Sequence, residues 1–154
     1  MNTKTLKKIH KTAAIFAFLF ITSFLTSTIV ADFFATPQQI AHVKSSVLMF
    51  IPGLILAMMI TGISAAKLYP GVAKGPFKVK QTRMKIAAIN GVFILLPAAI
   101  VLAKWSGLGQ FNDLYWTVQI VEIIAGMVNL AMIGLNIRDG IRLGRNANKE
   151  AIRY

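Results

Sequence analysis

Four long stretches of the chain carry almost no charge. No charged residue falls within 12–31, 45–66 or 86–103, and Glu122 is the only one within 114–137. The hydrocarbon core of a membrane is about 30 Å thick, and about 20 residues of helix cross it. We therefore predict four membrane-spanning helices, which cover about 12–32, 43–66, 84–104 and 114–137.

The connections between these stretches are rich in residues that break helices. Pro37 suits the first turn of a second helix, whereas Tyr69-Pro70-Gly71 and Gly75-Pro76 cannot both lie inside one helix. The segment 105–116 combines turn residues with the aromatic residues typical of a membrane interface. Short connections make sequential helices antiparallel neighbours. The sequence thus predicts an all-α, integral membrane up-down four-helix bundle that forms one transmembrane domain over 1–154.

The basic residues are concentrated on one side of this predicted membrane. The net charge is +12, and all 17 lysines and arginines except Lys44 and Lys104 lie before the first span, around a basic loop at 67–83, or in a basic tail at 138–154. By the positive-inside rule, we expect both termini and the 67–83 loop in the cytoplasm. Anionic lipid headgroups account for the basic charge, so no nucleic-acid partner is required.

The composition agrees with a membrane protein and excludes several kinds of chemistry. Apolar residues make up 56% of the chain and charged residues 14%, which does not suit a soluble domain of this length. The chain has no cysteine, which excludes disulfides, thiolate metal sites and cysteine nucleophiles. No glycine-rich phosphate loop or nucleophile elbow is present. The apolar run at 12–31 exceeds the roughly 7–15 residues of a secretory signal core, which favours an uncleaved first helix.

The fourth span carries a polar seam. Its members are separated alternately by three and four residues, which places them on one face of a helix. An unsatisfied polar group in hydrocarbon costs several kcal/mol, so we expect this seam to face the interior of the bundle. The seam consists of Gln119, Glu122, Gly126, Asn129, Ile133, Asn136 and Gly140.

The third span has a similar seam, which begins at Arg83 and includes Asn90. We expect Asn90 to meet Asn129 or Asn136 across the bundle, in an amide contact between helices. Pro97 and Pro52 each remove a backbone donor within a span, so a kink is expected at both. The predicted seam of the third span consists of Arg83, Ala87, Asn90, Ile94, Pro97, Val101 and Lys104.

Glu122 is a carboxyl group within a span and is therefore a candidate functional residue. We expect desolvation to keep it neutral, with a hydrogen bond to Asn129, Gln119 or a hydroxyl of another helix. The alternative is a proton or cation site. Because the spans offer no second ionisable group, the sequence gives this alternative little support.

A second cluster of polar residues is predicted at the cytoplasmic ends of the helices. His10, Arg83, Arg138 and Asp139 are brought there by an up-down topology. Asp139 most simply pairs with Arg83, Arg138 or Arg142 and anchors the helix ends. The alternative is a binding site for a headgroup or an anionic metabolite.

The histidines bear on whether haem is bound. His10 and His42 are predicted at opposite ends of the bundle, so one chain cannot place both on one haem iron. A haem b could still be held by His10 with Met84, or by a His42 pair across a dimer. A quinone could use the polar seam without any metal. No metal site is predicted.

Several of these residues resemble a known pattern. They are similar to the second half of an uncharacterised family of small bacterial four-span integral membrane proteins, and His10 before the first span fits that family. The resemblance implies a topology and no activity. The first span also resembles that of small membrane cytochromes b, although the second pair of suitably placed histidines is missing. The residues that carry the family resemblance are Arg83-Met84, Asn90-Gly91, Pro97, Glu122, Gly126, Asn129, Leu135-Asn136 and Arg138-Asp139-Gly140.

The sequence favours binding or assembly over catalysis, and no catalytic residue is predicted. We expect a small accessory or assembly subunit, or a binder of a lipid-soluble ligand that uses the polar seam. It would work in the lipid bilayer alone, as a homo-oligomer or within a larger membrane complex. The first alternative is a haem- or quinone-dependent electron-transfer protein. The second is an oligomeric proton-coupled carrier or channel that uses Glu122.

Overall fold

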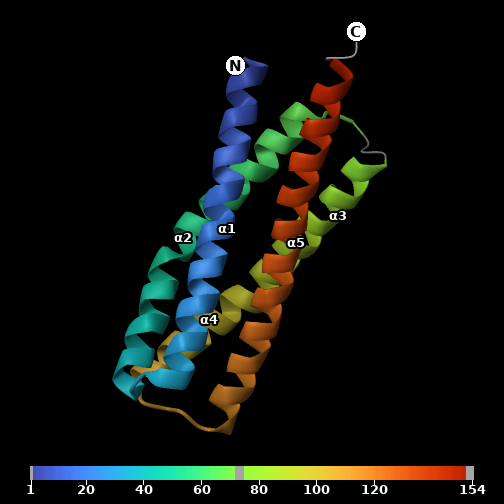
Figure 1. Ribbon diagram of the computed structural model, residues 1–154. Helices are drawn as coiled ribbons and strands as arrows, with labels where there is room; N and C mark the ends of the chain where they lie inside the picture. Colours follow the sequence, from blue (N-terminus) through green and yellow to red (C-terminus); the bar gives the residue numbers. More distant parts are fainter. Residues whose placement is uncertain (1, 72–74, 152–154) are drawn as a thin grey trace.

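The computed structural model describes residues 2–71 and 75–151, and all the elements in these ranges are helical. Four helices are long and apolar enough to cross a membrane. The third of them is continuous but is divided into α3, a π-helical turn η1 and α4 (Figure 1). The elements are α1 (Thr3–Phe34), α2 (Pro37–Leu68), α3 (Pro76–Asn90), η1 (Gly91–Leu95), α4 (Leu96–Gly107) and α5 (Asp113–Ala151).

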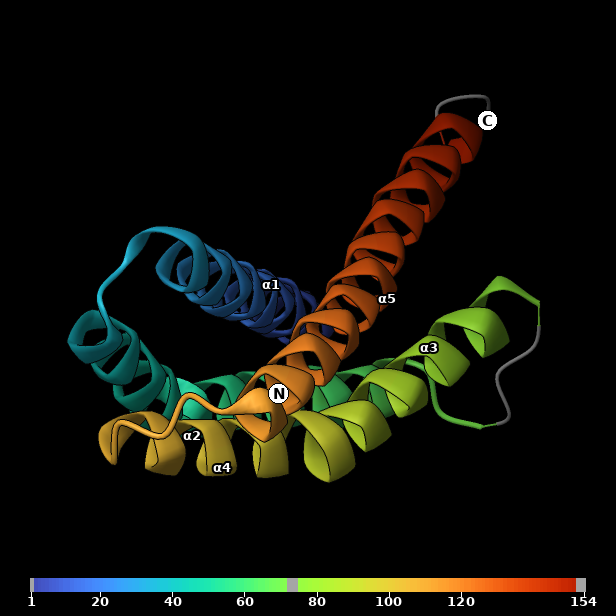
Figure 2. The same ribbon diagram turned by 90° about the horizontal axis from the view of Figure 1, so that it is seen from below.

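The helices alternate in direction, as the short connections predict. The α1–α2 and α4–α5 connections lie at one end of the molecule, here called the hairpin end. The start of α1, the end of α2, the start of α3 and the end of α5 lie at the other, here called the terminal end (Figure 1). In the view from below, α1 and α5 lie above α2 and α4 (Figure 2). Each helix packs against its two neighbours, in the order α1, α2, α3–α4, α5 and back to α1.

The helices extend beyond the predicted apolar windows. Thr36 caps α2 in a reciprocal capping box with Gln39, and Pro37 occupies the first turn. This early start puts almost two turns of helix before residue 43, where the second span is predicted to begin. At the terminal end, α2 continues to Leu68 and α3 begins at Pro76, so the connection is shorter than the predicted loop at 67–83. The predicted tail is helical as far as Ala151.

The distribution of side chains is inverted relative to that of a soluble protein. Large apolar side chains are exposed on every helix, among them Phe16, Met49, Phe93 and Ile120. The buried positions instead hold many alanines and hydroxyl or amide side chains. Helices in lipid pack through small residues and polar contacts, because lipid tails are as apolar as leucine. The buried polar or charged residues are Thr28, Lys44, Thr61, Ser64, Ser106, Gln119, Asn129 and Asn136.

Glycines allow close approach of α1 to its neighbours. A Cβ atom added to Gly53 of α2 would lie 3.1 Å from the ring of Phe20, and one added to Gly126 of α5 would lie 3.2 Å from Leu25 Cδ1. Ala13 and Ala17, which the sequence places on one face, are both buried. The small residues therefore determine how closely α1 packs against α2 and α5.

The π-helical turn changes which residues of the third span face inward, so part of the predicted seam is wrong. Arg83 is partly buried and Ala87 buried as predicted, but beyond Asn90 the prediction is wrong, because Ile94 and Lys104 are exposed. The backbone N–H of Leu96 donates to the Gly91 carbonyl, five residues earlier. The extra residue in this turn rotates the rest of the helix, and Pro97 follows it directly. The inward-facing residues of α4 are Ala98, Ala99, Leu102, Ala103 and Ser106.

Candidate functional site

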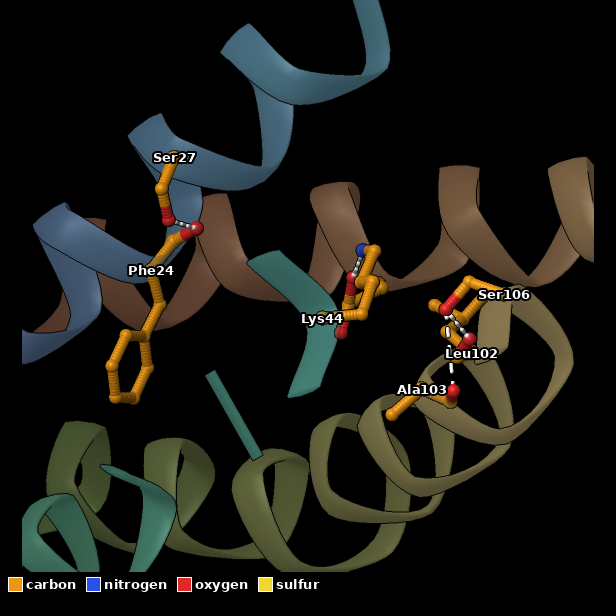
Figure 3. Close-up of polar contacts among 7 residues, drawn as sticks. Phe24, Ser27, Lys44, Leu102, Ala103 and Ser106 are labelled. Atoms are coloured by element: carbon orange, nitrogen blue, oxygen red, sulfur yellow. Dashed lines mark hydrogen bonds and ion pairs between the residues drawn. The ribbon is translucent and has the colours of Figure 1, made fainter. Parts of the chain in front are cut away.

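An ion pair lies between α2 and α5 near the hairpin end. Lys44 Nζ donates to Glu122 Oε2 at 2.6 Å, and the side chains are 2% and 12% exposed. Figure 3 shows Lys44 reaching from α2 toward α5, with Ser106 of α4 on the neighbouring helix. Taking two charges out of water costs several kcal/mol per ion, which the attraction between them offsets only at close range. Such a pair within a span marks a functional residue by default.

The predicted partners of Glu122 were therefore wrong. The sequence predicts an amide or hydroxyl partner for Glu122 and places Lys44 at the outer start of the second span, away from it. In the structure Lys44 lies two turns inside α2, on the same buried face as Ile40 and Val47. Lys44 follows Ile40 by four residues and precedes Val47 by three, and this helical spacing is the sequence signal that could have predicted its burial. The premise that the spans hold no second ionisable group was also wrong.

Asp32 adds a second carboxyl group to this region. It lies in the last turn of α1, and both of its carboxylate oxygens are buried without a hydrogen-bond partner. The charges of Lys44 and Glu122 are both close enough to act on it. A buried carboxylate that accepts no hydrogen bond is costly, so this residue needs water, an ion, a ligand or its own proton.

Tyr115 and Gln119 complete the same group. Tyr115 is 0% exposed and Gln119 is 1% exposed, and neither the phenolic oxygen nor either amide atom has a partner. Tyr115 and Gln119 are one turn apart on α5. The charges of Asp32 and Glu122 both act electrostatically on the Tyr115 hydroxyl. We call Asp32, Lys44, Tyr115, Gln119 and Glu122 the hairpin-end cluster. Sequence reasoning placed Glu122 and Gln119 on the seam but missed the other three.

The apolar surroundings of the cluster hold it in place. The ring of Tyr115 packs against Ala31, Ile40 and Leu102 in a buried apolar group. Phe111 contacts Tyr115 edge to face at 4.9 Å between ring centroids. Phe111 also lines an open groove at the hairpin end, between α2 and α4, which contains His42 and Ser106. One aromatic residue thus touches both the groove and the cluster.

A second polar group lies in the middle of the bundle and is well satisfied. Asn90 Nδ2 donates to Asn129 Oδ1 and to the Ala125 carbonyl, both at 2.8 Å. Asn129 Nδ2 donates to the Ala87 carbonyl at 3.2 Å. The predicted contact between Asn90 and Asn129 is therefore present, directly before the π-helical turn. Because these amides bond each other and the backbone, their arrangement is that of an interhelical lock.

At the terminal end, the structure separates the predicted cluster into two parts. Arg83 donates to Asp139 at 2.6 Å, and Arg138 also donates to Asp139, at 3.2 Å. His10 instead lies against α2, where its Nδ1 donates to the Thr61 carbonyl at 3.1 Å and lies 3.0 Å from Ser64 Oγ. His10 of α1 packs against the C-terminal half of α2, whereas the exposed His42 lies near the N-terminal end of α2. One chain therefore cannot place both histidines on one haem iron.

Asn136 links α5 to α3 close to this end. Its Nδ2 donates to the Lys80 carbonyl at 3.0 Å, while its Oδ1 is buried without a partner. The seam of α5 thus faces inward along its length, with Gln119, Asn129, Ile133 and Asn136 all buried. Within the described residues, no group of three or more histidine, aspartate or glutamate side chains could hold a metal ion.

The arrangement of these groups distinguishes the hairpin-end cluster from the rest of the seam. Comparisons with protein-family models, with curated proteins and with solved structures gave no match. Among the described residues, all the buried side-chain polar atoms without a partner belong to Asp32, Tyr115, Gln119 and Asn136. Three of these residues lie in the hairpin-end cluster, which makes it the candidate functional site.

Proposed function

We propose that the protein is a multi-pass protein of a bacterial inner membrane, with the terminal end in the cytoplasm. The distribution of charge supports this orientation, because the lysines and arginines of the described residues, except Lys44 and Lys104, lie on helix segments toward the terminal end. The charge of Lys44 is neutralised by its ion pair with Glu122. Among the described residues, Lys104 is therefore the exposed lysine or arginine toward the hairpin end. The difference in unpaired positive charge between the two ends is thus larger than the count of lysines and arginines in the sequence indicates.

Cysteine labelling tests this orientation directly, because the chain has no cysteine of its own. We expect Asn112→Cys, in the exposed α4–α5 connection, to react with a membrane-impermeant maleimide in intact spheroplasts. Lys7→Cys, in the first turns of α1, should react only after lysis. Labelling at position 7 but not at 112 in intact spheroplasts would contradict the proposed orientation.

We further propose that the protein is a non-catalytic binder of a lipid-soluble ligand, whose polar end occupies the hairpin-end cluster. The observation that carries this proposal is the set of buried, unpartnered atoms of Gln119, Tyr115 and Asp32. A buried polar group left without a partner costs about 1–3 kcal/mol, so three such residues near the same end of the bundle favour an additional molecule there. The large apolar side chains on the outer faces of the helices would contact the lipid in which such a ligand dissolves.

Replacing Gln119 tests this function. We expect Gln119→Leu to lose a small molecule that the wild-type protein retains when it is purified in native lipid and analysed by native mass spectrometry. The stripped variant should be at least as stable as the wild type, because the substitution removes an unpaired buried amide. Gln110→Leu makes the same chemical change at an exposed position and serves as the control. Identical retained molecules in all three proteins would contradict the proposal.

A second candidate is an oligomeric proton-coupled carrier or channel. The observation that favours it is the presence of Asp32 and Lys44 beside Glu122, which supplies a chain of ionisable groups on three helices. Proton flux into liposomes that disappears in Glu122→Gln would favour this function over ligand binding. Flux that equals that of empty liposomes would favour ligand binding.

A further inference from the structure

We propose that the ligand of the hairpin-end cluster carries a single positive charge, and that it is an amphiphile with a primary ammonium head. This inference rests on the proposed ligand-binding function and specifies the chemistry of the ligand. It depends on the charges and on the unpartnered atoms of the cluster.

The charges of the cluster do not balance. Asp32 and Glu122 are both carboxyl groups, whereas Lys44 is the only basic residue of the cluster and is paired with Glu122. When both carboxyl groups are ionised, Asp32 is left with an uncompensated negative charge. A buried charge without a partner is strongly unfavourable, and a bound cation compensates it directly. An anionic ligand would add to the imbalance.

The hydrogen-bonding atoms point to the same class of ligand. The unpartnered atoms of the cluster are one nitrogen that donates, Gln119 Nε2, and four oxygens that can accept, namely both carboxylate oxygens of Asp32, Gln119 Oε1 and the phenolic oxygen of Tyr115. A primary ammonium has three N–H donors and no acceptor, so it matches a site that is rich in acceptors. An alcohol offers one donor. A quinone offers none and would leave the Asp32 carboxylate unsatisfied.

Burial makes these acceptors a formed site rather than a surface patch. Tyr115 and Gln119 are 0% and 1% exposed, and both oxygens of Asp32 are buried. They come from α1 and α5, and the Lys44 ammonium of α2, paired with Glu122, shows that the bundle already accommodates a buried ammonium near this end. A second ammonium next to Asp32 would give each carboxylate its own cation.

The test compares three amphiphiles that share one alkyl chain. Dodecylammonium, dodecanol and dodecyl phosphate are titrated into the wild-type protein in detergent, and binding is followed by native mass spectrometry. We expect dodecylammonium to bind at least about tenfold more tightly than the other two, since charge-assisted hydrogen bonds are about twice as strong as neutral ones. Asp32→Asn should remove this preference. Asp113→Asn, which removes an exposed carboxylate at the same end, should preserve it.

The outcomes separate this inference from the proposed function. Equal binding of dodecanol and dodecylammonium, lost in Gln119→Leu but unchanged in Asp32→Asn, would overturn the ammonium assignment and retain ligand binding. Preference for dodecyl phosphate would overturn the charge argument in the same way. Binding of all three amphiphiles that is unchanged in Gln119→Leu would overturn the proposed function itself. If Asp32→Asn does not fold, the preference among the three amphiphiles in the wild type decides the question.

Discussion

Replacing Lys44 by methionine is expected to lower the free energy of unfolding by about 3–5 kcal/mol, the largest effect of any single substitution considered for this chain. Methionine retains most of the apolar stem of the lysine side chain, so the loss comes from the charge. Glu122 is only 12% exposed, and without the ammonium its carboxylate would be buried with no partner. Asp32 would lose the same nearby positive charge. SDS-induced unfolding in mixed micelles measures the change.

Two further variants test whether the loss of stability comes from the ion pair or from any substitution in this part of the chain. Lys104→Met makes the same change at an exposed position toward the hairpin end, and it should alter the unfolding free energy little. The double variant Lys44→Met with Glu122→Leu should recover most of the lost stability, because replacing both members of a buried pair by apolar groups is often neutral or stabilising. If the double variant were as unstable as Lys44→Met alone, the pair would not explain the loss.

The fate of Lys44 shows what sequence reasoning can recover in a membrane protein and what it misses. The apolar windows and helix breakers predict four helices of alternating direction, and the structure has four helices long and apolar enough to span a membrane. Pro37 also indicates where the second helix begins, but an apolar window does not say which of the charges beside it face the interior of the bundle. The Thr36 capping box starts α2 early enough to carry Lys44 inside the bundle. In a hydropathy pattern a charged residue marks the end of an apolar window, and Lys44 directly precedes the window at 45–66. The ion pair with Glu122 could therefore not be predicted from that pattern alone.

The two polar seams make a similar contrast. On α5 the regular spacing of Gln119, Asn129 and Asn136 correctly predicts burial, because that helix is regular throughout. On the third span the same reasoning holds as far as Asn90 and then fails at the π-helical turn, which adds one residue to the turn and rotates α4. Pro97 marks a disturbance in the sequence, but a proline does not say whether the helix will kink, break or widen.

Asn129 occupies the point where these two helices are held together, and Asn129→Leu is expected to lower the unfolding free energy by about 1–3 kcal/mol. Asn129 is 1% exposed, accepts from Asn90 and donates to the Ala87 carbonyl. Leucine is similar in size but leaves the Ala87 carbonyl without this donor, and it leaves Asn90 Nδ2 with the Ala125 carbonyl as its remaining acceptor. SDS-induced unfolding again gives the change.

A double-mutant cycle with Asn90→Leu assigns this loss to the amide contact. Interhelical hydrogen bonds in a membrane protein contribute on average about 0.6 kcal/mol and at most about 1.7 kcal/mol. We expect a coupling energy toward the upper value, since Asn90 Nδ2 and Asn129 Oδ1 are 2.8 Å apart and both amides also bond the facing backbone. The two substitutions together should then cost less than the sum of the single losses. Strict additivity would mean that each amide acts only through the backbone carbonyl to which it donates, and that the Asn90–Asn129 bond itself contributes nothing.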